Sequence, residues 1–528
     1  MPGTEQAVPM DSGGSPIAAP PRLRRAAVAA LGAYVAVLAA TSLFWRFTQD
    51  AAMQLYLGWL YVEHGYVPYR DTFETSMPGA PLMHALIVAV LGASDMAFRV
   101  WDVAWVVAFL AVMWRLMRPF GRDVALVGPL LFAAHYLGTG PPISFQRDFF
   151  LLLPPMAAAL AATHLRGGFA RGFLIGAGAG MAATVKPQAA LLALPIAAWQ
   201  IAEDRAARPG APWRAHAPLV LGILLGGASV GAVTAAFLAW NGALGTFLDF
   251  STGYMKLYAH LDGSLRPVSA GERLLNIAKG ARNLSDKPLW FAAALLGVYR
   301  AVYRAELDGV ARRRLLLFLG LAAYAFAHVL FQAKFWIYHW LPWMVVVTAL
   351  SALCLLPGKD STGRGEGRFA ALALLVVALL SLPVPNESIR IATGRGPTPP
   401  KHGSPDRIAA WLAQHSRPGD VAQCIDLIGG GAHALLIARL PLATEFATDL
   451  QFHHDVDDPK FAPRRRHFVE RLAASRARFV VEIIDHRMWP TGPNTTREFP
   501  ELRALLERDY RVAVEDPAFL IWERSATE

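Results

Sequence analysis

The sequence contains little charge. Asp, Glu, Lys and Arg make up 17% of its residues and hydrophobic residues 54%, whereas an ordinary soluble domain carries roughly a quarter charged residues. Ala26–Trp45 and Pro218–Trp240 contain no charged residue, and about 20 apolar residues cross a hydrocarbon core as a helix. The alternating segments of about 10 residues that mark a transmembrane β-barrel are missing. The sequence therefore predicts an α-helical polytopic membrane protein.

Cysteine is scarce as well. Cys354 lies in an apolar run and Cys424 in the polar C-terminal region, and two such distant cysteines exclude a disulfide framework. We expect no cleavable signal peptide, because the first apolar run is too long for the hydrophobic core of one. Residues 1–21 are rich in Gly, Pro, Ala and Ser, and this composition predicts a disordered cytoplasmic N-terminus.

The net charge of +10 does not indicate a nucleic-acid partner. A nucleic-acid-binding domain gathers its cations on one face or in one tail, whereas the arginines here lie in short clusters between apolar runs. The positive-inside rule explains such clusters as cytoplasmic loops. The clusters lie at Arg22–Arg25, Arg115–Arg122, Arg166–Arg171, Arg205–Arg214, Arg300–Arg314 and Lys359–Arg368.

Successive cytoplasmic clusters must be separated by an even number of crossings. Counting the apolar runs under this condition predicts about eleven transmembrane helices, with the N-terminus in the cytoplasm and the C-terminus outside. The run between Arg171 and Arg205 supplies two of them because it breaks at Lys186-Pro187. We expect a transmembrane catalytic domain over 22–389, with a first outer loop over 46–98, in the plasma (inner) membrane of a bacterium.

From about residue 390 onward the sequence changes character. Charged residues, His and Pro occur throughout, and short strand-like runs alternate with helix-like stretches. The expected strands are Val421–Ile425, Phe479–Ile484 and Phe519–Trp522, and the expected helices are Asp406–His415 and Phe499–Asp509. Residues 390–528 are therefore predicted to form a linker and a small extracytoplasmic α/β domain.

The first outer loop carries the most informative carboxylate, Asp50. Two apolar stretches that follow it, Ala51–Glu63 and Gly79–Leu91, are too short to span a membrane and are expected to lie along its surface as helices. Asp50 directly precedes the first of them. Its carboxylate could act as a general base on an acceptor hydroxyl, or its side chain could simply cap the helix.

Three further outward turns place isolated cations at the membrane surface: Arg147, Lys186 and Lys334. A charge at membrane depth usually faces a cavity or a partner, and cations with His339 beside them suit a phosphate group. Two alternatives remain open. An ion pair with Asp148 would explain Arg147, and extension of the side chain to the membrane interface would explain Lys334.

The order of these segments resembles the membrane-embedded GT-C glycosyltransferases. Asp50 opens an outer loop that continues GYVPYRDTFETSMPGAPL, and QRDFFLLLPP, TVKPQAALLALP and KFWIYHWLPW follow further along the chain. The resemblance covers nearly the whole chain. It is to the bacterial branch with the aminoarabinose and galacturonosyl transferases, and more distantly to the protein O-mannosyltransferases. It implies that a sugar moves from a polyprenyl-phosphate donor to a lipid, polysaccharide or protein acceptor on the outer face of the membrane.

The resemblance also implies roles for single residues. In this family the Asp of the first outer loop is the catalytic base, and it maps to Asp50. Arg99 matches an arginine that the family carries just before the second span. Lys186, Lys334 and His339 correspond to positions near the donor phosphate.

The chain departs from the family pattern at two places. The family often has Asp-Glu where this chain has Asp50-Ala51, and a Lys or His before the Pro of the second surface helix, where Ser76-Met77 stand here. Glu74 could replace the missing acid. The residues that could support the site are Tyr69, Asp71, Glu74, Asp148 and Tyr338, although an aromatic belt at the membrane interface explains Tyr338 equally well.

We therefore expect an inverting glycosyl transfer among membrane lipids, with Asp50 as general base. The donor phosphate is expected to contact Arg99, Arg147, Lys186, Lys334 and His339. No redox cofactor is required. No protein metal site is predicted, since the run His453–Asp458 fits a solvated loop, while a divalent metal between Asp50 and the phosphate stays open. The main alternative is a transporter or flippase of a lipid-linked sugar, followed by a structural or sensory membrane protein.

Overall fold

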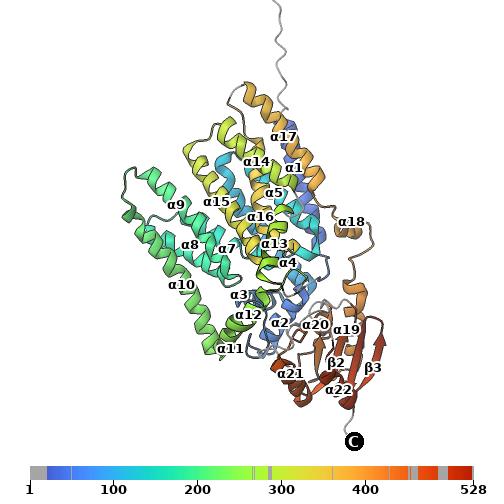
Figure 1. Cartoon of the computed structure of the whole chain (residues 1–528). Coiled ribbons are helices and arrows are strands. Elements are labelled where there is room, and N and C mark those ends of the chain that lie inside the picture. Colours follow the sequence, from blue (N-terminus) through green and yellow to red (C-terminus); the bar gives the residue numbers. More distant parts are fainter. Residues whose placement is uncertain are drawn as a thin grey trace, which may run out of the picture.

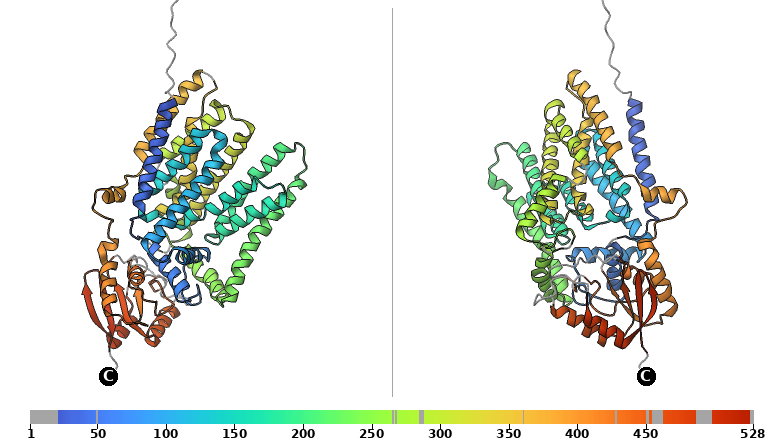
Figure 2. Two further views of the ribbon diagram at one scale, coloured as in Figure 1. Left: turned by 180° about the vertical axis from the view of Figure 1, so that it is seen from behind. Right: turned by 45° about the vertical axis from the view of Figure 1, so that its right-hand side comes forward.

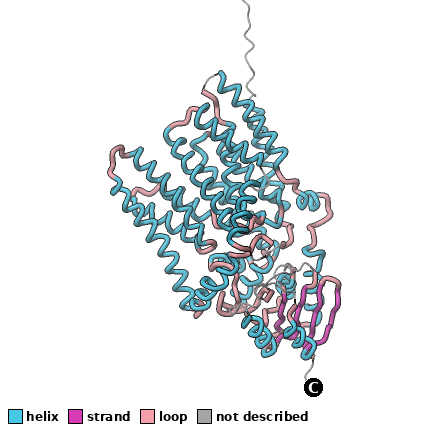
Figure 3. Tube along the Cα trace, viewed as in Figure 1, coloured by secondary structure: helices cyan, strands magenta, loops and turns pink. Residues whose placement is uncertain are grey.

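The chain folds into a mostly helical body with one small sheet near the C-terminus of the described residues (Figures 1 and 3). The computed structural model describes residues 21–48, 50–264, 266, 268–283, 288–359, 361–426, 429–449, 452–453, 462–485 and 498–525. Two expectations fall outside this description. They concern the N-terminal segment 1–21, of which Pro21 alone is described, and the polar run that follows His453.

Each apolar run predicted to cross the membrane contains a helix. The helices are α1 (Pro21–Ser42), α4 (Asp95–Met117), α5 (Arg122–Thr139), α6 (Arg147–Phe150), α7 (Leu153–Ala162), α8 (Gly168–Ala183), α9 (Ala193–Ala207), α10 (Ala217–Trp240), α14 (Pro288–Tyr299), α15 (Gly309–Gln332), α16 (Leu341–Ser351) and α17 (Ser361–Ser381). The predicted break at Lys186-Pro187 is present, because α8 ends at Ala183 and the short turn η3 (Pro187–Leu192) follows.

Length and composition identify the strongest membrane spans. In the described residues five helical stretches are long and apolar enough to cross a membrane, and a sixth if α17 and α18 (Asn386–Ala392), bent by 72° at their junction, count as one span. The other helices are shorter because proline and polar turns interrupt them. The chain is a multi-pass membrane protein, and the number of about eleven crossings stays a prediction.

Helices α8 and α10 pack together through glycine. A Cβ atom placed on Gly176 of α8 would lie 2.0 Å from the carbonyl oxygen of Ile223 in α10, and one on Gly222 would lie 2.3 Å from the carbonyl oxygen of Phe169. Small residues let two helices approach this closely in a membrane, where packing rather than the hydrophobic effect holds them together. The same two helices form one side of the body, beside α7 and α9 (Figure 2).

We expect Gly176→Leu to separate α8 from α10 and to lower the midpoint of thermal unfolding in detergent by several degrees. The leucine side chain meets the backbone of α10, which cannot move aside without loosening the whole contact. Gly231→Leu on α10 is the matched control, since nothing lies within 4 Å of a Cβ placed there. Equal midpoints for the two variants would contradict this packing.

Helices α2 (Ala51–Glu63) and α3 (Gly79–Leu91) have the predicted bounds. Their position along the membrane surface stays a prediction, but α2 is not exposed on one side as expected, because ten of its thirteen residues are buried. The C-terminal region covers the helix: the Tyr56 hydroxyl donates to the carbonyl oxygen of Leu440 at 2.9 Å, and the Tyr66 hydroxyl donates to that of Leu442 at 2.8 Å. Helix α2 therefore lies between α3 and the C-terminal region.

Between α10 and α14 the chain forms helices that the sequence analysis did not predict. They are α11 (Leu244–Asp249), the π-helical turn η5 (Phe250–Tyr254), α12 (Met255–Ala259) and α13 (Ala270–Asn283). Figure 1 shows α11 and α12 at the same end of the body as α2 and α3. This segment matters because it contributes one wall of the cavity described below.

The C-terminal region contains a four-stranded sheet of order β1-β2-β4-β3. Strand β1 (Val421–Ile425) pairs parallel with β2 (Ala477–Ile483), and β4 (Phe519–Arg524) pairs antiparallel with β2 and with β3 (Tyr510–Asp516). The helices here are α19 (Ser404–His415), α20 (Gly431–Ala438), α21 (Ala462–Ala474) and α22 (Pro500–Asp509). Strand β3 and helices α20 and α21 were not predicted.

The sheet region and the first loop lie at one end of the helical body, and α1 begins at the other end (Figures 1 and 2). Arg46 ties the junction together, because its guanidinium pairs with Asp95 at 3.0 Å and with Asp406 at 2.8 Å. The arrangement brings the loop that contains Asp50 next to the C-terminal region.

Candidate active site

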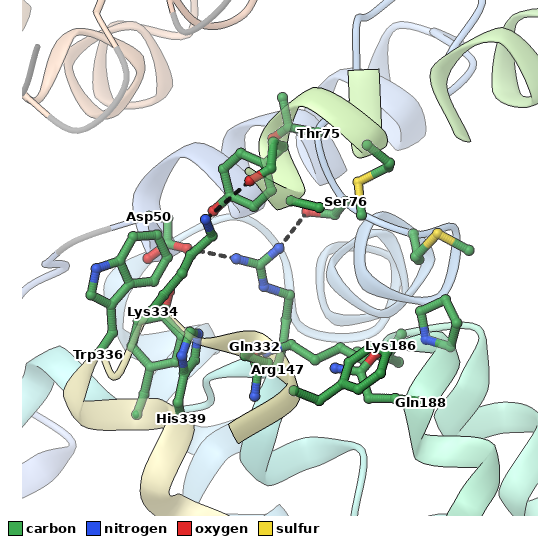
Figure 4. A pocket seen from close by; sticks show the side chains of 18 of the residues that line it. Asp50, Thr75, Ser76, Arg147, Lys186, Gln188, Gln332, Lys334, Trp336 and His339 are labelled. Carbon is green, nitrogen blue, oxygen red and sulfur yellow. Dashed lines mark hydrogen bonds and ion pairs between the residues drawn. The ribbon is translucent and has the colours of Figure 1, made fainter. Parts of the chain in front are cut away.

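A cavity of about 450 Å³ opens at the end of the helical body that carries α2 and α3 (Figure 4). Its walls come from several parts of the chain: the start of α2, the turn before α3, the start of α6, the turn between α8 and η3, the segment around α12, and the end of α15 with the turn that follows it. Of the residues predicted for the site, those that line the cavity are Asp50, Arg147, Lys186, Lys334, Tyr338 and His339.

Asp50 does not cap helix α2. Its backbone carbonyl accepts a hydrogen bond from the Gln54 amide at 3.0 Å, but its side chain accepts none from the first turn. The carboxylate instead faces Arg147, whose Nη2 lies 3.4 Å from Oδ2 (Figure 4). The side-chain amide of Gln146 contacts it as well, with Nε2 3.4 Å from Oδ1. The carboxylate therefore points into the cavity rather than to the end of the helix.

Arg147 joins the two outer walls of the cavity. Its Nη1 donates to the Ser76 hydroxyl at 2.9 Å while Nη2 contacts Asp50. No ion pair joins Arg147 to Asp148, so that alternative does not explain the arginine. Ser76 is one of the two positions where the family resemblance led us to expect a cation, and here its hydroxyl contacts the Arg147 guanidinium.

Asp148 is fully buried behind the cavity and organises Lys186. Its carboxylate accepts from Lys186 Nζ at 2.6 Å, from His328 Nε2 at 2.8 Å and from Gln332 Nε2 at 3.0 Å. Because a carboxylate only accepts, His328 carries its hydrogen on Nε2, and its Nδ1 accepts from the Tyr324 hydroxyl at 3.0 Å. Lys186 also donates to the side-chain oxygen of Gln332. The network holds the lysine at the cavity wall.

The Lys334 side chain is held by backbone carbonyl groups of the protein and does not extend away from it. Its ammonium donates to the carbonyl oxygens of Tyr258 and Leu261 at 3.1 and 2.6 Å and lies 4.2 Å from the centroid of the Tyr258 ring. Burial, followed by the charge of Arg273, lowers the pKa of Lys334 to about 7. The contacts fasten the segment around α12 over the cavity.

His339 and Tyr338 complete the wall next to Lys334. Their rings meet edge to face with centroids 4.8 Å apart, and Trp336 packs on His339 at 5.3 Å. The Nδ1 atom of His339 is buried and has no hydrogen-bond partner in the part of the chain that the structure describes. This imidazole therefore has a polar atom left for a ligand.

Backbone strain accompanies these side chains. Phe145, Ala333 and Phe335 adopt φ values of 48°, 56° and 52°, a left-handed conformation that costs a residue with a side chain roughly 1–2 kcal/mol. The first precedes Arg147 by two residues, and the other two flank Lys334. Strain of this kind persists where the surrounding structure enforces it, typically at functional sites.

Arg99 lies outside the cavity. It is fully buried under the loop, where its guanidinium donates to the carbonyl oxygens of Trp45 and Arg46 at 3.4 and 2.8 Å and to the Ser144 hydroxyl. Asp102 accepts from the same hydroxyl. The Arg99 guanidinium thus holds the start of the first loop in place. We therefore leave Arg99 out of the proposed phosphate contacts.

Three other residues proposed to support the site do not line the cavity. The Tyr69 hydroxyl donates to the Ser76 carbonyl at 2.6 Å, and the Glu74 carboxylate accepts from the amides of Thr75 and Ser76 at 2.9 and 3.0 Å. Asp71 pairs with Arg70 at 2.7 Å. Burial raises the pKa of Glu74. Tyr69 and Glu74 shape the Ser76 turn, and the Glu74 carboxylate does not replace an acid in the cavity.

Several residues of the site, some in the cavity lining and some behind it, were missed from the sequence. Gln146 contacts Asp50, while Gln332 and the buried His328 hold Asp148; Tyr258 and Arg273 come from the helical segment that was not predicted. The spacing of His328 and Gln332 on α15, four residues apart, places both on one helix face. This spacing of two polar residues in an apolar helix could have indicated that they act together.

The charge of the cavity suits an anion. Among the described residues that line it, four are cationic, Arg147, Lys186, Arg273 and Lys334, and a single one, Asp50, is a carboxylate. Oxygen-rich anions such as phosphates bind where guanidinium and ammonium groups converge. Among its described residues, the cavity therefore combines a cationic wall with one carboxylate.

Comparison with known proteins identifies the fold. The structure of ArnT from Cupriavidus metallidurans, solved with undecaprenyl phosphate, superimposes over 96% of this chain and 98% of ArnT, with a TM-score of 0.56 at 14% identity. The family model for dolichyl-phosphate-mannose-protein mannosyltransferases matches residues 75–240.

The chain has a GT-C fold. The predicted fold class, an α-helical membrane protein with a small α/β region at the C-terminus, is thereby confirmed.

Weaker similarities accompany this match. The Archaeoglobus fulgidus oligosaccharyltransferase in its apo form covers 94% of this chain and 74% of its own at 11% identity, with a TM-score of 0.48. The oligosaccharyltransferase AglB of the same organism, in complex with an inhibitory peptide and a dolichol-phosphate, has the same coverage at 10% identity and a TM-score of 0.44. The search of curated proteins gave no match.

The residues of this GT-C cavity do not match the ligand set of a divalent metal. Hard cations need several oxygen ligands, whereas the Asp50 carboxylate contacts a guanidinium and an amide nitrogen. In the described residues no group of three or more His, Cys, Asp or Glu side chains is placed to hold a metal ion. We therefore derive no step through a metal.

Proposed function

We propose that this protein is a glycosyltransferase that moves a sugar from a polyprenyl-phosphate donor to an acceptor hydroxyl. The observation that carries the proposal is the cavity in which Arg147 and Lys186 face the single carboxylate of Asp50. The GT-C fold, and the undecaprenyl phosphate bound by ArnT, support the same class of donor.

The proposed reaction is a direct displacement. The acceptor oxygen attacks the anomeric carbon on the face opposite the phosphate, and Asp50 takes the hydroxyl proton. The bond between the anomeric carbon and the phosphate oxygen breaks, and its electron pair leaves with the polyprenyl phosphate. The configuration at the anomeric carbon inverts. Asp50 is the residue suited to the proton transfer, because its carboxylate is the one that lines the cavity among the residues that the structure describes.

Arg147 and Lys186 are proposed to stabilise the leaving phosphate. The Lys186 ammonium has three hydrogens, and Asp148 and Gln332 accept two of them. The Arg147 guanidinium has five, of which Ser76 and Asp50 accept two. Both cations therefore keep donors for phosphate oxygens, and such contacts stabilise charge that develops on the leaving group.

The orientation in the membrane is part of the proposal. If the arginine clusters are cytoplasmic, the cavity and the C-terminal region lie on the outer face of a bacterial inner membrane. The apolar surface of α8, α9 and α10 then faces lipid, which suits the prenyl chain of the donor.

The proposal is tested with purified protein in lipid vesicles, a panel of radiolabelled polyprenyl-phosphate sugars and total membrane extract. We expect label from one donor to appear in an acceptor, and the NMR coupling of the anomeric proton to show the inverted configuration. Retention of configuration would contradict a single displacement with Asp50 as base.

Removal of divalent metals is expected to leave transfer unchanged. The cavity offers one carboxylate and several cations, and a second positive ion would compete with these cations for the phosphate. The measurement is the transfer rate before and after dialysis against EDTA, with Mg²⁺, Mn²⁺ and Zn²⁺ added back separately. A rate that falls at least tenfold and returns with one ion would contradict the cationic mechanism.

A further inference from the structure

A second cavity, of about 220 Å³, lies between the first outer loop and the C-terminal region. Its walls include Phe47 and Thr48 from the loop before α2, and Lys401, Asp426 and His433 from the C-terminal region. The proposed reaction does not involve it.

Three buried polar atoms in its walls have no hydrogen-bond partner among the described residues. They are Oδ1 of Asp426, Nε2 of His433 and Oγ1 of Thr48. The Asp426 and His433 side chains belong to residues that are 7% and 2% exposed. Leaving such groups unpaired is costly, so their convergence on one cavity indicates a polar ligand.

The local backbone is built to present Asp426. The turn Gly429–Gly431 wraps around its carboxylate, and the Gly430 amide donates to Oδ2 at 3.0 Å. Gly430 adopts a φ of 113°, which favours glycine, and a Cβ atom on Gly431 would lie 2.4 Å from Oδ1. A larger residue at Gly431 would close the space beside the unpaired oxygen.

The groups favour a neutral, hydroxyl-rich ligand. The Asp426 carboxylate disfavours a second phosphate, and one cation, Lys401, stands near it. Burial, followed by the charge of Asp449, raises the pKa of Asp426 to about 7, so near neutral pH its carboxyl group both donates and accepts. Sugar hydroxyls have the same double capacity. The ring of Phe47, packed edge to face on His433 at 5.2 Å, offers an apolar wall for a sugar ring.

The second cavity adjoins the first. Met53 and Pro142 line both. On the side of the first cavity, the Gln146 side chain bridges the Pro142 carbonyl and the Asp50 carboxylate, with both distances 3.4 Å. A group bound in the second cavity therefore lies next to the base without occupying the cationic wall.

We propose that this second cavity is an acceptor subsite that binds one sugar ring of a carbohydrate-bearing acceptor through Asp426, His433 and Thr48. The assignment of the ring to the acceptor rests on the proposed function, whereas binding of the ring does not. The small volume admits a single ring rather than an oligosaccharide.

The first test is binding. Saturation-transfer NMR is recorded with methyl glucoside, galactoside and mannoside on the full chain in lipid nanodiscs. We expect a signal with wild type and with Glu515→Gln, a matched loss of charge on the exposed side of β3, and at least about a fivefold smaller signal with Asp426→Asn. Ala432→Leu, which fills the cavity and retains Asp426, is expected to reduce it similarly.

The subsite would be overturned if Asp426→Asn and Ala432→Leu both gave a signal as large as that of the wild type, or if the wild type gave no signal. Thermal unfolding checks the fold of each variant, and Ala432→Leu decides the matter if Asp426→Asn does not fold.

The second test is transfer to the membrane extract. We expect Asp426→Asn to raise the acceptor KM about tenfold and to leave the donor KM unchanged. Transfer with an unchanged acceptor KM would refute the subsite while the proposed function stands. A different outcome is also informative: the wild type binds glycosides but transfers no sugar, and Asp426→Asn abolishes the binding. That outcome would refute the proposed function and leave the sugar-binding site.

Discussion

Asp50→Asn is expected to reduce the rate of sugar transfer at least about 100-fold, because a positioned general base contributes roughly 10²- to 10⁴-fold. Asparagine has nearly the same size as aspartate, and the Asp50 side chain makes no helix cap, so the fold is retained. Removing a negative charge 3.4 Å from Arg147 does not weaken phosphate binding, and the donor KM is expected to stay the same or fall. Initial rates at varied donor concentration separate the two effects.

Asp71→Asn is the matched control for this variant. Asp71 belongs to the same loop, but it pairs with Arg70 and does not line the cavity. Its variant is expected to keep a rate within about twofold of wild type, since an exposed ion pair contributes little to stability. If Asp50→Asn kept the wild-type rate and Asp71→Asn lost it, the general base would be Asp71 and not Asp50.

Lys186→Met is expected to have two effects, on stability and on donor binding. It leaves the fully buried carboxylate of Asp148 without its cation, and breaking a buried ion pair in this way costs about 3–5 kcal/mol. It also removes a phosphate contact, which raises the donor KM at least about tenfold. Thermal unfolding and donor titration of the same preparation measure the two effects.

The double variant Asp148→Asn/Lys186→Met separates the two roles of the lysine. Asparagine removes the unpaired charge and still accepts from His328 and Gln332, so the unfolding midpoint is expected to recover most of its loss. The donor KM is expected to stay raised. Recovery of a wild-type donor KM in the double variant would make Lys186 a structural residue only. Lys279→Met, on the surface of α13, controls for the loss of a nearby positive charge.

The helices of this protein could be predicted well from its sequence because lipid imposes strict requirements on composition. Each uncharged run became a helix, and the break at Lys186-Pro187 followed from a cation and a proline inside an apolar stretch. Burial of α2 could not be predicted, since it depends on Leu440 and Leu442, which lie far away in the sequence. Strand β3 was missed although Tyr510, Val512 and Val514 alternate along it; most of its residues are exposed, so burial does not mark it out.

Site residues could be predicted where an isolated charged residue lies in an apolar stretch of the sequence. Arg147 and Lys186 were conspicuous as isolated charges, and both line the cavity together with Asp50. Arg99 was equally conspicuous, but its donors are taken by backbone carbonyls. Which cation faces a cavity depends on the left-handed backbone at positions such as Phe145 and on contacts from α12. Neither leaves a clear pattern in the sequence.

The chemical fate of a doubly labelled donor tests the central proposal most directly. A polyprenyl-phosphate sugar with ³H in the sugar and ³²P in the phosphate is supplied to wild-type protein in sealed vesicles with acceptor extract. The account predicts that the labels separate, with ³H in the acceptor and ³²P in free polyprenyl phosphate in equal amounts. Labels that stay together while the donor moves across the bilayer would contradict it and identify a flippase.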